Sequence, residues 1–152
     1  MTLGKRGEQL IKKRELFSFN AYLPTPDDVP TIAWGHTKGV KLGMTCTLEQ
    51  GQQWFIEDMQ ESVDAVRRLM AKMSIPLTQS MFDALVSLVY NTGESSISSG
   101  STIGSALITQ KDYYKAWAGF TLWRKQAKKD LLGLARRRSE EMTLFLEDGI
   151  PR

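Results

Sequence analysis

The chain has 152 residues, of which 41% are hydrophobic and 24% charged, with a formal net charge of +3 at pH 7. This length and composition predict one soluble globular domain with its own hydrophobic core. A single cysteine, Cys46, excludes an intrachain disulfide and a cysteine-rich zinc site. Because the chain also has only one histidine, we expect no metal and no cofactor. The polar N-terminal residues lack a signal peptide or membrane anchor, so we expect cytoplasmic synthesis and no membrane insertion.

The N-terminal third predicts a short helix followed by a small β-rich lobe. Residues 4–14 have the apolar spacing of an amphipathic helix. From residue 15 to 44, aromatic and β-branched residues alternate with proline, aspartate and glycine. This pattern predicts short strands with hairpin turns near residues 24–30 and 38–43.

The middle of the chain predicts one long helix. Thr47 and Gln50 have the spacing of a capping box, in which each residue caps the backbone N–H of the other. Apolar residues then recur every three or four positions, which predicts a helix from 48 to about 73 that ends before Pro76. Such a helix is long enough to join two lobes.

The C-terminal half predicts further helices around a buried one. Thr78 is placed to cap a helix that is apolar on almost every side, and a loop rich in glycine and serine follows it. The helices expected after that loop cover residues 103–109, 112–123 and 134–147.

We therefore expect an α+β, mainly helical fold in a single domain over residues 1–152. Its parts are a β-lobe of about 15–45, a long linking helix of about 48–73 and a larger helical lobe of about 76–148. A substrate cleft is expected where the two lobes meet, because clefts form at such junctions.

Positive charge gathers between Arg124 and Arg138, where seven basic residues stand against Asp130 alone. Such a block favours an anionic partner, whether nucleic acid, anionic lipid or an acidic cell-wall polymer, and the alternative is a solvated helix face. Nucleic-acid binding would need exposed aromatic side chains among these charges. Because Trp117 and Trp123 have the spacing of core residues, we expect no nucleic-acid partner.

The chemistry that the residues best support is carboxylate chemistry. The chain has neither a G-x-S-x-G nucleophile motif nor a glycine-rich phosphate loop. Hydrolysis of a glycosidic bond needs a carboxylic acid that protonates the leaving oxygen, and a carboxyl group in a partly apolar cleft can hold that proton near neutral pH. Glu15, at the junction of helix and β-lobe, fits this requirement, and an ordinary surface charge is the alternative.

Beyond these patterns, the chain resembles the phage-type lysozymes, the T4-like and P22-like endolysins of glycoside hydrolase family 24. In that family a helix ends in a glutamate, alanine and tyrosine follow six and seven residues later, and a hairpin leads to a threonine and a Gly-His-Thr run. The matching residues here are Glu15, Ala21, Tyr22, Thr31 and the run Gly35-His36-Thr37. The segments "GMTCTLEQ", "PLTQSMFDALVSLVYNTG" and "LARRRSEEMTLFL" extend the likeness to about residues 7–147.

The resemblance implies a lysozyme-like fold and a hydrolase that cuts the β-1,4 bond between N-acetylmuramic acid and N-acetylglucosamine in bacterial peptidoglycan, lysing the host cell. It implies that Glu15 is the general acid and that Thr31 lines the catalytic cleft. It further implies that His36 pairs with Asp58 on the long helix, a contact that we interpret as structural. The residues matched to the sugar-binding cleft are Asn91, Gly93 and Arg137 or Arg138.

The chain departs from the family pattern on both sides of the hairpin. Leu16 stands where the family has glycine, so we expect a less sharp turn after Glu15. The family's aspartate two residues after the tyrosine is replaced by Pro24, and one extra residue before Thr31 allows Thr25 to take its place.

Three mechanisms remain open from the sequence. In the first, Asp27 or Asp28 returns to the cleft as an inverting partner of Glu15, with the carboxyl groups about 6.5–9.5 Å apart, although aspartates are also typical of turns. In the second, Thr31 and Thr25 position the attacking water. In the third, a substrate hydroxyl attacks, which is lytic transglycosylation and needs Glu15 alone. A lysozyme-shaped protein that binds peptidoglycan without cutting it is the remaining alternative.

The expected partner is peptidoglycan, and a cleft enzyme of this size is expected to act as a monomer. Without an export signal, release from the host cytoplasm to the cell wall would depend on a separate holin that permeabilises the membrane, or on delivery within a virion.

Overall fold

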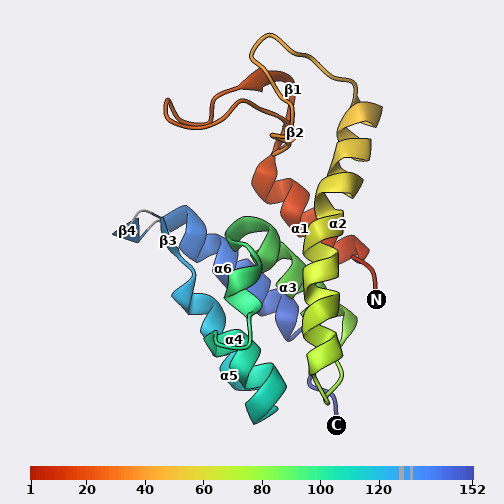
Figure 1. Cartoon of the computed structure of the whole chain (residues 1–152), viewed down its shortest axis with the longest axis vertical. Helices are drawn as coiled ribbons and strands as arrows, with labels where there is room; N and C mark the ends of the chain where they lie inside the picture. The colour runs from red at the N-terminus through yellow and green to blue at the C-terminus, as the bar shows by residue number, and fades with distance from the viewer. Residues whose placement is uncertain (127–128, 131) are drawn as a thin grey trace. The chain divides into compact units, whose positions relative to one another are not determined.

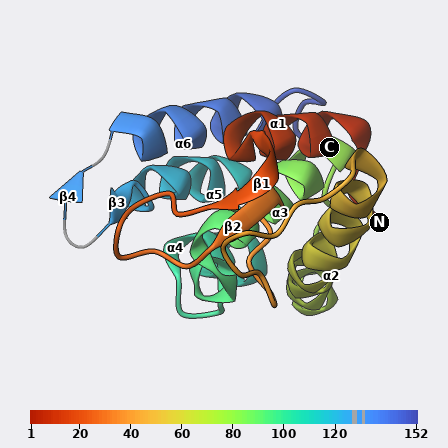
Figure 2. The same ribbon diagram turned by 90° about the horizontal axis from the view of Figure 1, so that it is seen from above.

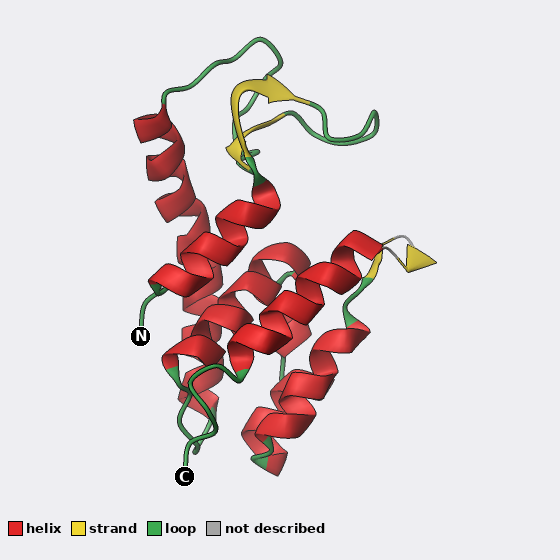
Figure 3. Cartoon of the chain, turned by 180° about the vertical axis from the view of Figure 1, so that it is seen from behind, coloured by secondary structure: helices red, strands yellow, loops and turns green. Residues whose placement is uncertain are grey.

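The computed structural model describes residues 1–126, 129–130 and 132–152 and is mainly helical (Figure 3). Its strands form two separate antiparallel pairs, β1 with β2 and the very short β3 with β4. The expected α+β, mainly helical fold is confirmed. In chain order the elements are α1 (Lys5–Glu15), β1 (Phe17–Tyr22), β2 (Thr31–Trp34), α2 (Leu48–Lys72), α3 (Gln79–Thr92), η1 (Glu94–Ile97), α4 (Thr102–Ser105), η2 (Ala106–Gln110), α5 (Tyr113–Gly119), η3 (Phe120–Leu122), β3 (Lys125–Gln126), β4 (Lys129–Asp130) and α6 (Leu132–Phe145) (Figure 1).

The chain divides into two compact units. The hairpin unit comprises Ile11–Glu61, and the helical unit comprises Met1–Leu10 together with Ser62–Arg152. The helices α1 and α2 each run from one unit into the other. The expected single domain and its expected lobe boundaries stay predictions.

The hairpin unit is built on the β1–β2 pair. Phe17 lies opposite Trp34 and Tyr22 opposite Thr31, with a shift of register between these two ends. The backbone N–H of Cys46 donates to the carbonyl of Phe19 at 2.9 Å, so the chain before α2 lies along the other edge of β1. The small core beneath these strands consists of Ile32, Ala33, Val40 and Cys46, against which Phe17, Ala21, Met44 and Trp54 pack.

The expected caps of the two central helices are present. The backbone N–H of Thr47 donates to Gln50 Oε1 at 2.8 Å, and the N–H of Gln50 donates to Thr47 Oγ1 at 3.1 Å, which is the capping box. Thr78 Oγ1 accepts from the N–H of Met81 at 3.2 Å and begins α3. These contacts satisfy backbone donors that the first turn of a helix leaves unpaired.

The core of the helical unit forms around α3. Most of this helix is buried, because apolar residues occupy nearly every side of it. Figures 1 and 2 show α6 alongside α3, and the two helices are in contact along their lengths. The indole N–H of Trp117 on α5 donates to the carbonyl of Met142 on α6 at 3.1 Å, and the Phe120 and Phe145 rings meet edge to face with centroids 5.6 Å apart.

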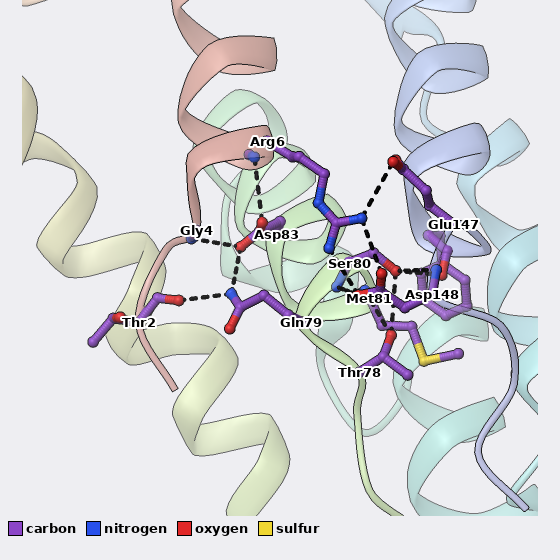
Figure 4. Close-up of polar contacts among 12 residues, drawn as sticks. Thr2, Gly4, Arg6, Thr78, Gln79, Ser80, Met81, Asp83, Glu147 and Asp148 are labelled. Atoms are coloured by element: carbon purple, nitrogen blue, oxygen red, sulfur yellow. Dashed lines mark hydrogen bonds and ion pairs between the residues drawn. The ribbon is translucent and has the colours of Figure 1, made fainter.

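A buried carboxylate holds the start of α1 within the helical unit. Asp83 on α3 is fully buried and accepts a hydrogen bond from the backbone N–H of Gly4 at 2.8 Å (Figure 4). It also accepts one from the backbone N–H of Gly7 at 3.3 Å. The side chain of Gln79 donates to it at 2.8 Å. Asp83 therefore caps the N-terminus of α1, although it lies 79 positions from Gly4 and 76 positions from Gly7 in the chain.

An ion pair ties the same segment to the C-terminal turn. The guanidinium of Arg6 donates to both carboxylate oxygens of Asp148, at 2.9 and 2.8 Å, and lies 3.2 Å from Glu147 (Figure 4). Asp148 also accepts from the backbone N–H of Ser80 at 2.9 Å. These contacts lower the pKa of Asp148, the Arg6 hydrogen bond most and the Ser80 N–H next.

Among the residues that the structure describes, none of the helices combines the length and the apolar character needed to cross a membrane.

Candidate active site

Glu15 is the last residue of α1 and is partly buried. The helix closes there, because the N–H of Leu16 donates to the carbonyl of Lys12 at 3.0 Å. Leu16 has φ = 53°, the left-handed conformation that glycine adopts most easily, and its side chain is 70% exposed. The turn after Glu15 is therefore kept without glycine, at a cost of about 1–2 kcal/mol in backbone strain. The expectation of a less sharp turn is wrong, because Leu16 adopts the left-handed conformation.

Thr31 is the first residue of β2 and is buried. Its hydroxyl donates to the carbonyl of Val29 at 3.0 Å. Since a hydroxyl has one proton to give, this bond leaves the oxygen of Thr31 as an acceptor.

Asp28 lies in the exposed loop between the strands. Its N–H donates to the carbonyl of Thr25 at 3.0 Å, and its carboxylate accepts from the N–H of Val29 at 2.9 Å. Pro26 and Asp27 occupy the centre of this turn. Both contacts of Asp28 are local, and they are those of a residue that shapes a turn.

His36 and Asp58 are in contact, as the resemblance implied. Nδ1 of the buried His36 lies 2.8 Å from Asp58 Oδ2 on α2. The imidazole also stacks on the Trp54 ring, with centroids 4.6 Å apart and planes 5° from parallel. This stacking was not predicted from the sequence. Its signal in the sequence is the spacing of Trp54, which lies one helical turn before Asp58 and therefore on the same face of α2.

Lys12, which the sequence did not single out, lies one helical turn before Glu15. Its ammonium is 4.1 Å from the centroid of the Trp34 ring and 4.9 Å from that of Phe55. It also donates to Gln52 Oε1 at 2.5 Å. These partners come from β2 and α2, so helix spacing in α1 could not reveal them.

Asn91 lies in the last turn of α3, and it borders a groove in the helical unit. The groove has a volume of about 360 Å³ and is lined by Asn91, Thr92, Trp123, Lys125 and Leu134. Gly93 follows with φ = 92° and ends the helix by donating its N–H to the carbonyl of Val89 at 2.7 Å. A positive φ of this kind favours glycine at this position.

Arg137 and Arg138 are buried, and both pair with the fully buried Glu141. Arg137 also donates to the carbonyl and hydroxyl oxygens of Ser87, each at 3.4 Å, and Arg138 donates to the carbonyl of Trp123 at 2.9 Å. Burial lowers the pKa of Arg138, although Glu141 opposes this effect.

Arg137 and Arg138 are therefore not available at the surface to an anionic partner, and the alternative of a solvated helix face is wrong for these two residues. Glu141 follows them by three and four residues, a spacing typical of ion pairs within a helix, and this is the signal in the sequence for the pairing. Of the other charges in the block, Arg124, Lys125 and Arg136 are exposed. Lys128 lies outside the described residues. The binding of substrate by Arg137 stays a prediction.

In residues 1–126, 129–130 and 132–152, the structure shows no group of three or more His, Cys, Asp or Glu side chains arranged to bind a metal ion.

The family model for phage lysozyme matches residues 12–141. The endolysin of Salmonella phage P22 is 36% identical over 151 residues, with 96% of this chain and 99% of that protein covered. The endolysin of Bacillus phage B103 is 34% identical over 148 residues, which cover 96% of this chain but 54% of that protein.

Solved structures agree with the sequence relatives. An endolysin from Escherichia coli O157:H7 phage FAHEc1 superposes with a TM-score of 0.85 at 30% identity, covering 100% of this chain and 98% of that chain. A P22 lysozyme mutant gives a TM-score of 0.79 at 34% identity, covering 96% and 99%. The fold is therefore lysozyme-like, and the class is that of the peptidoglycan-degrading hydrolases known as endolysins. The chain belongs to the phage lysozyme family.

Proposed function

We propose that the chain hydrolyses the β-1,4 bond between N-acetylmuramic acid and N-acetylglucosamine, with Glu15 as the general acid. The observation that carries this proposal is the position of Glu15, which ends α1 beside the left-handed Leu16 and directly before the hairpin. This arrangement falls inside the region that the phage lysozyme model matches. Glu15 would protonate the leaving oxygen while the glycosidic bond breaks.

We assign the positioning of the attacking water to Thr31. Its hydroxyl proton is used on Val29, so its oxygen can accept a hydrogen bond from water and orient a lone pair of that water toward the sugar. Asp28 is the weaker candidate for this role, because it is exposed and its carboxylate is engaged with the adjacent backbone. Transglycosylation with Glu15 alone remains the alternative reaction.

The groove of the helical unit is proposed to bind the polymer. Trp123 can offer an apolar ring face to a sugar, Asn91 can donate and accept hydrogen bonds, and Lys125 can attract the carboxylates of the peptide stem. Gly93 would act by ending α3 beside Asn91. Arg137 would act indirectly, since it binds Ser87, one helical turn before Asn91.

Family membership also supports the remaining proposals on partners and location. The chain would be made in the host cytoplasm, act as a monomer, and reach the cell wall after a separate holin permeabilises the membrane. It would then act on peptidoglycan without a cofactor.

The test measures loss of turbidity in Gram-negative cells stripped of their outer membrane, for the parent, Glu15→Gln and the control Glu61→Gln. Glu61 is an exposed residue of α2, so its variant should clear cells like the parent. Glu15→Gln should lose at least about a hundredfold in rate, as expected on removal of a general acid. Clearing by Glu15→Gln at the parental rate would overturn the proposal.

Mass analysis of the released muropeptides identifies the reaction. Reducing ends would establish hydrolysis, whereas anhydro ends would establish transglycosylation. A Thr31→Ala variant should lose rate more strongly than Asp28→Asn if Thr31 positions the water. If both the parent and Glu15→Gln bind the wall and neither clears cells, the chain is a binding protein.

A further inference from the structure

The ammonium of Lys12 is held by partners that come from two other elements of the hairpin unit. It lies over the face of the Trp34 ring, near the Phe55 ring, and within hydrogen-bond distance of Gln52 Oε1. A cation over an aromatic face is attracted by the ring quadrupole, and the attraction grows as water is removed. Because Lys12 is partly buried, this cation–π contact is partly shielded from bulk water.

The ring beneath Lys12 is itself held in place. Trp34 meets Phe17 edge to face at a centroid distance of 4.6 Å and Phe55 at 6.0 Å. Edge-to-face pairs of this kind fix the orientation of a ring as well as its distance. Lys12 therefore connects the last turn of α1 to a cluster of three packed rings on β1, β2 and α2.

That last turn needs such a connection if its final residue is to hold one position. Helix ends fray, since their last carbonyl groups lack partners within the helix. Here the helix ends at Glu15, and the next residue, Leu16, is largely exposed, so burial of its side chain restrains the turn only weakly. The carbonyl of Lys12 accepts the N–H of Leu16, so fixing Lys12 also fixes the closing hydrogen bond of the helix.

An apolar side chain would fill the same space without the cost of partly desolvating an ammonium. Methionine has a similar length and adapts to irregular surroundings. What lysine adds is direction, because both the cation–π contact and the hydrogen bond to Gln52 depend on where the nitrogen lies. A catalytic acid needs this kind of support, since misplacement by about 1 Å can cost two orders of magnitude in rate.

We propose that Lys12 is a positioning residue for Glu15: its contacts with Trp34, Phe55 and Gln52 hold the last turn of α1 in the orientation that catalysis requires. This inference rests on the proposed role of Glu15 as the general acid. Lys12 acts through the helix and touches neither the substrate nor the reacting atoms.

The experiment compares kcat and KM on purified peptidoglycan for five proteins: the parent, Lys12→Met, Lys12→Arg, the control Lys13→Met and Glu15→Gln. Lys12→Met should lower kcat about tenfold and leave KM within about twofold, because the site is less ordered and the substrate contacts are kept. Lys12→Arg should recover most of the rate, since a guanidinium also binds over aromatic rings. Lys13→Met removes a charge from the exposed neighbour and should behave like the parent.

A second variant tests the contact between Lys12 and Gln52 by changing the residue on α2. Gln52→Leu removes the acceptor on α2 and should lower kcat in the same sense. When it is combined with Lys12→Met, the loss should be smaller than the product of the two separate losses, because both changes break one contact. Melting temperatures of all variants show whether a fall in kcat reflects unfolding, and the Gln52→Leu variant decides the question if Lys12→Met does not fold.

The possible outcomes separate the two proposals. If Glu15→Gln is inactive while Lys12→Met keeps the parental kcat, positioning by Lys12 is refuted and the acid role of Glu15 stands. A rise in KM alone for Lys12→Met would mean substrate contact and would also refute it. If Glu15→Gln is as active as the parent, the proposed function fails and this inference fails with it.

Discussion

Replacing Asp83 by alanine should test whether one buried carboxylate anchors the N-terminal segment. The change removes the acceptor for the N–H groups of Gly4 and Gly7 and for the side chain of Gln79. Gly7 is buried, so its N–H would lose its partner without gaining water, whereas the donors of Gly4 and Gln79 are partly buried and can be rehydrated in part.

The magnitude follows from these contacts. A hydrogen bond to a charged acceptor contributes about 1.5–3 kcal/mol, and a buried donor left unpaired costs about 1–3 kcal/mol. Three bonds are lost, but the variant no longer buries a carboxylate, which offsets part of the loss. We expect a net decrease of about 3 kcal/mol in the free energy of unfolding, equivalent to a fall of about 6–12 °C in Tm for a chain of this size.

The assay is thermal unfolding followed by circular dichroism at neutral pH. Asp83→Asn keeps one acceptor oxygen, so its Tm should fall by about half as much as that of Asp83→Ala. Asp64→Ala, which breaks a half-exposed pair with Arg67, should change stability by less than about 1 kcal/mol. A Tm of Asp83→Ala within about 2 °C of the parent Tm would refute the reasoning, because the expected fall is about 6–12 °C.

Two further variants probe other parts of the chain. The lowered pKa of Asp148 means that its ion pair contributes stability above the unfolded pKa of about 3.9 and loses that contribution as the pH falls through the lower folded value. The gap in Tm between the parent and Asp148→Asn should therefore be constant above about pH 5 and should narrow toward pH 3; a gap that widens in acid would contradict the assignment. Leu16→Gly should relieve about 1–2 kcal/mol of strain against about 0.4–1 kcal/mol of added unfolded-state entropy, and so raise Tm by about 1–4 °C in thermal unfolding. A lower Tm would show that the exposed leucine side chain stabilises the hairpin unit.

Most helix boundaries follow from local sequence. Thr47 with Gln50 and Thr78 predicted where α2 and α3 begin, and the caps are present in the structure. Capping depends on residues within three or four positions of each other, so a short stretch of sequence contains the information. The motif around Glu15 is equally local, which is why the amino-acid sequence alone reveals the resemblance to phage lysozymes.

The turn after Glu15 shows where a local rule fails. Glycine is favoured at a left-handed position, and its absence predicted a relaxed turn, yet Leu16 has φ = 53°. The pairing of β1 with β2, which places Phe17 opposite Trp34, outweighs the preference of a single residue. The conformational preference of a single residue contributes less free energy than the packing of the elements that it joins.

The sequence by itself thus determined the family, the main helices and the glutamate on which the proposed chemistry depends. Only the tertiary structure decided that Arg137 and Arg138 are buried, that Asp83 caps α1, and that the ammonium of Lys12 rests on Trp34. The physical reason is the range of the interactions involved. Caps and helical periodicity join residues within one or two turns, whereas burial and cation–π contacts join segments that only folding brings together.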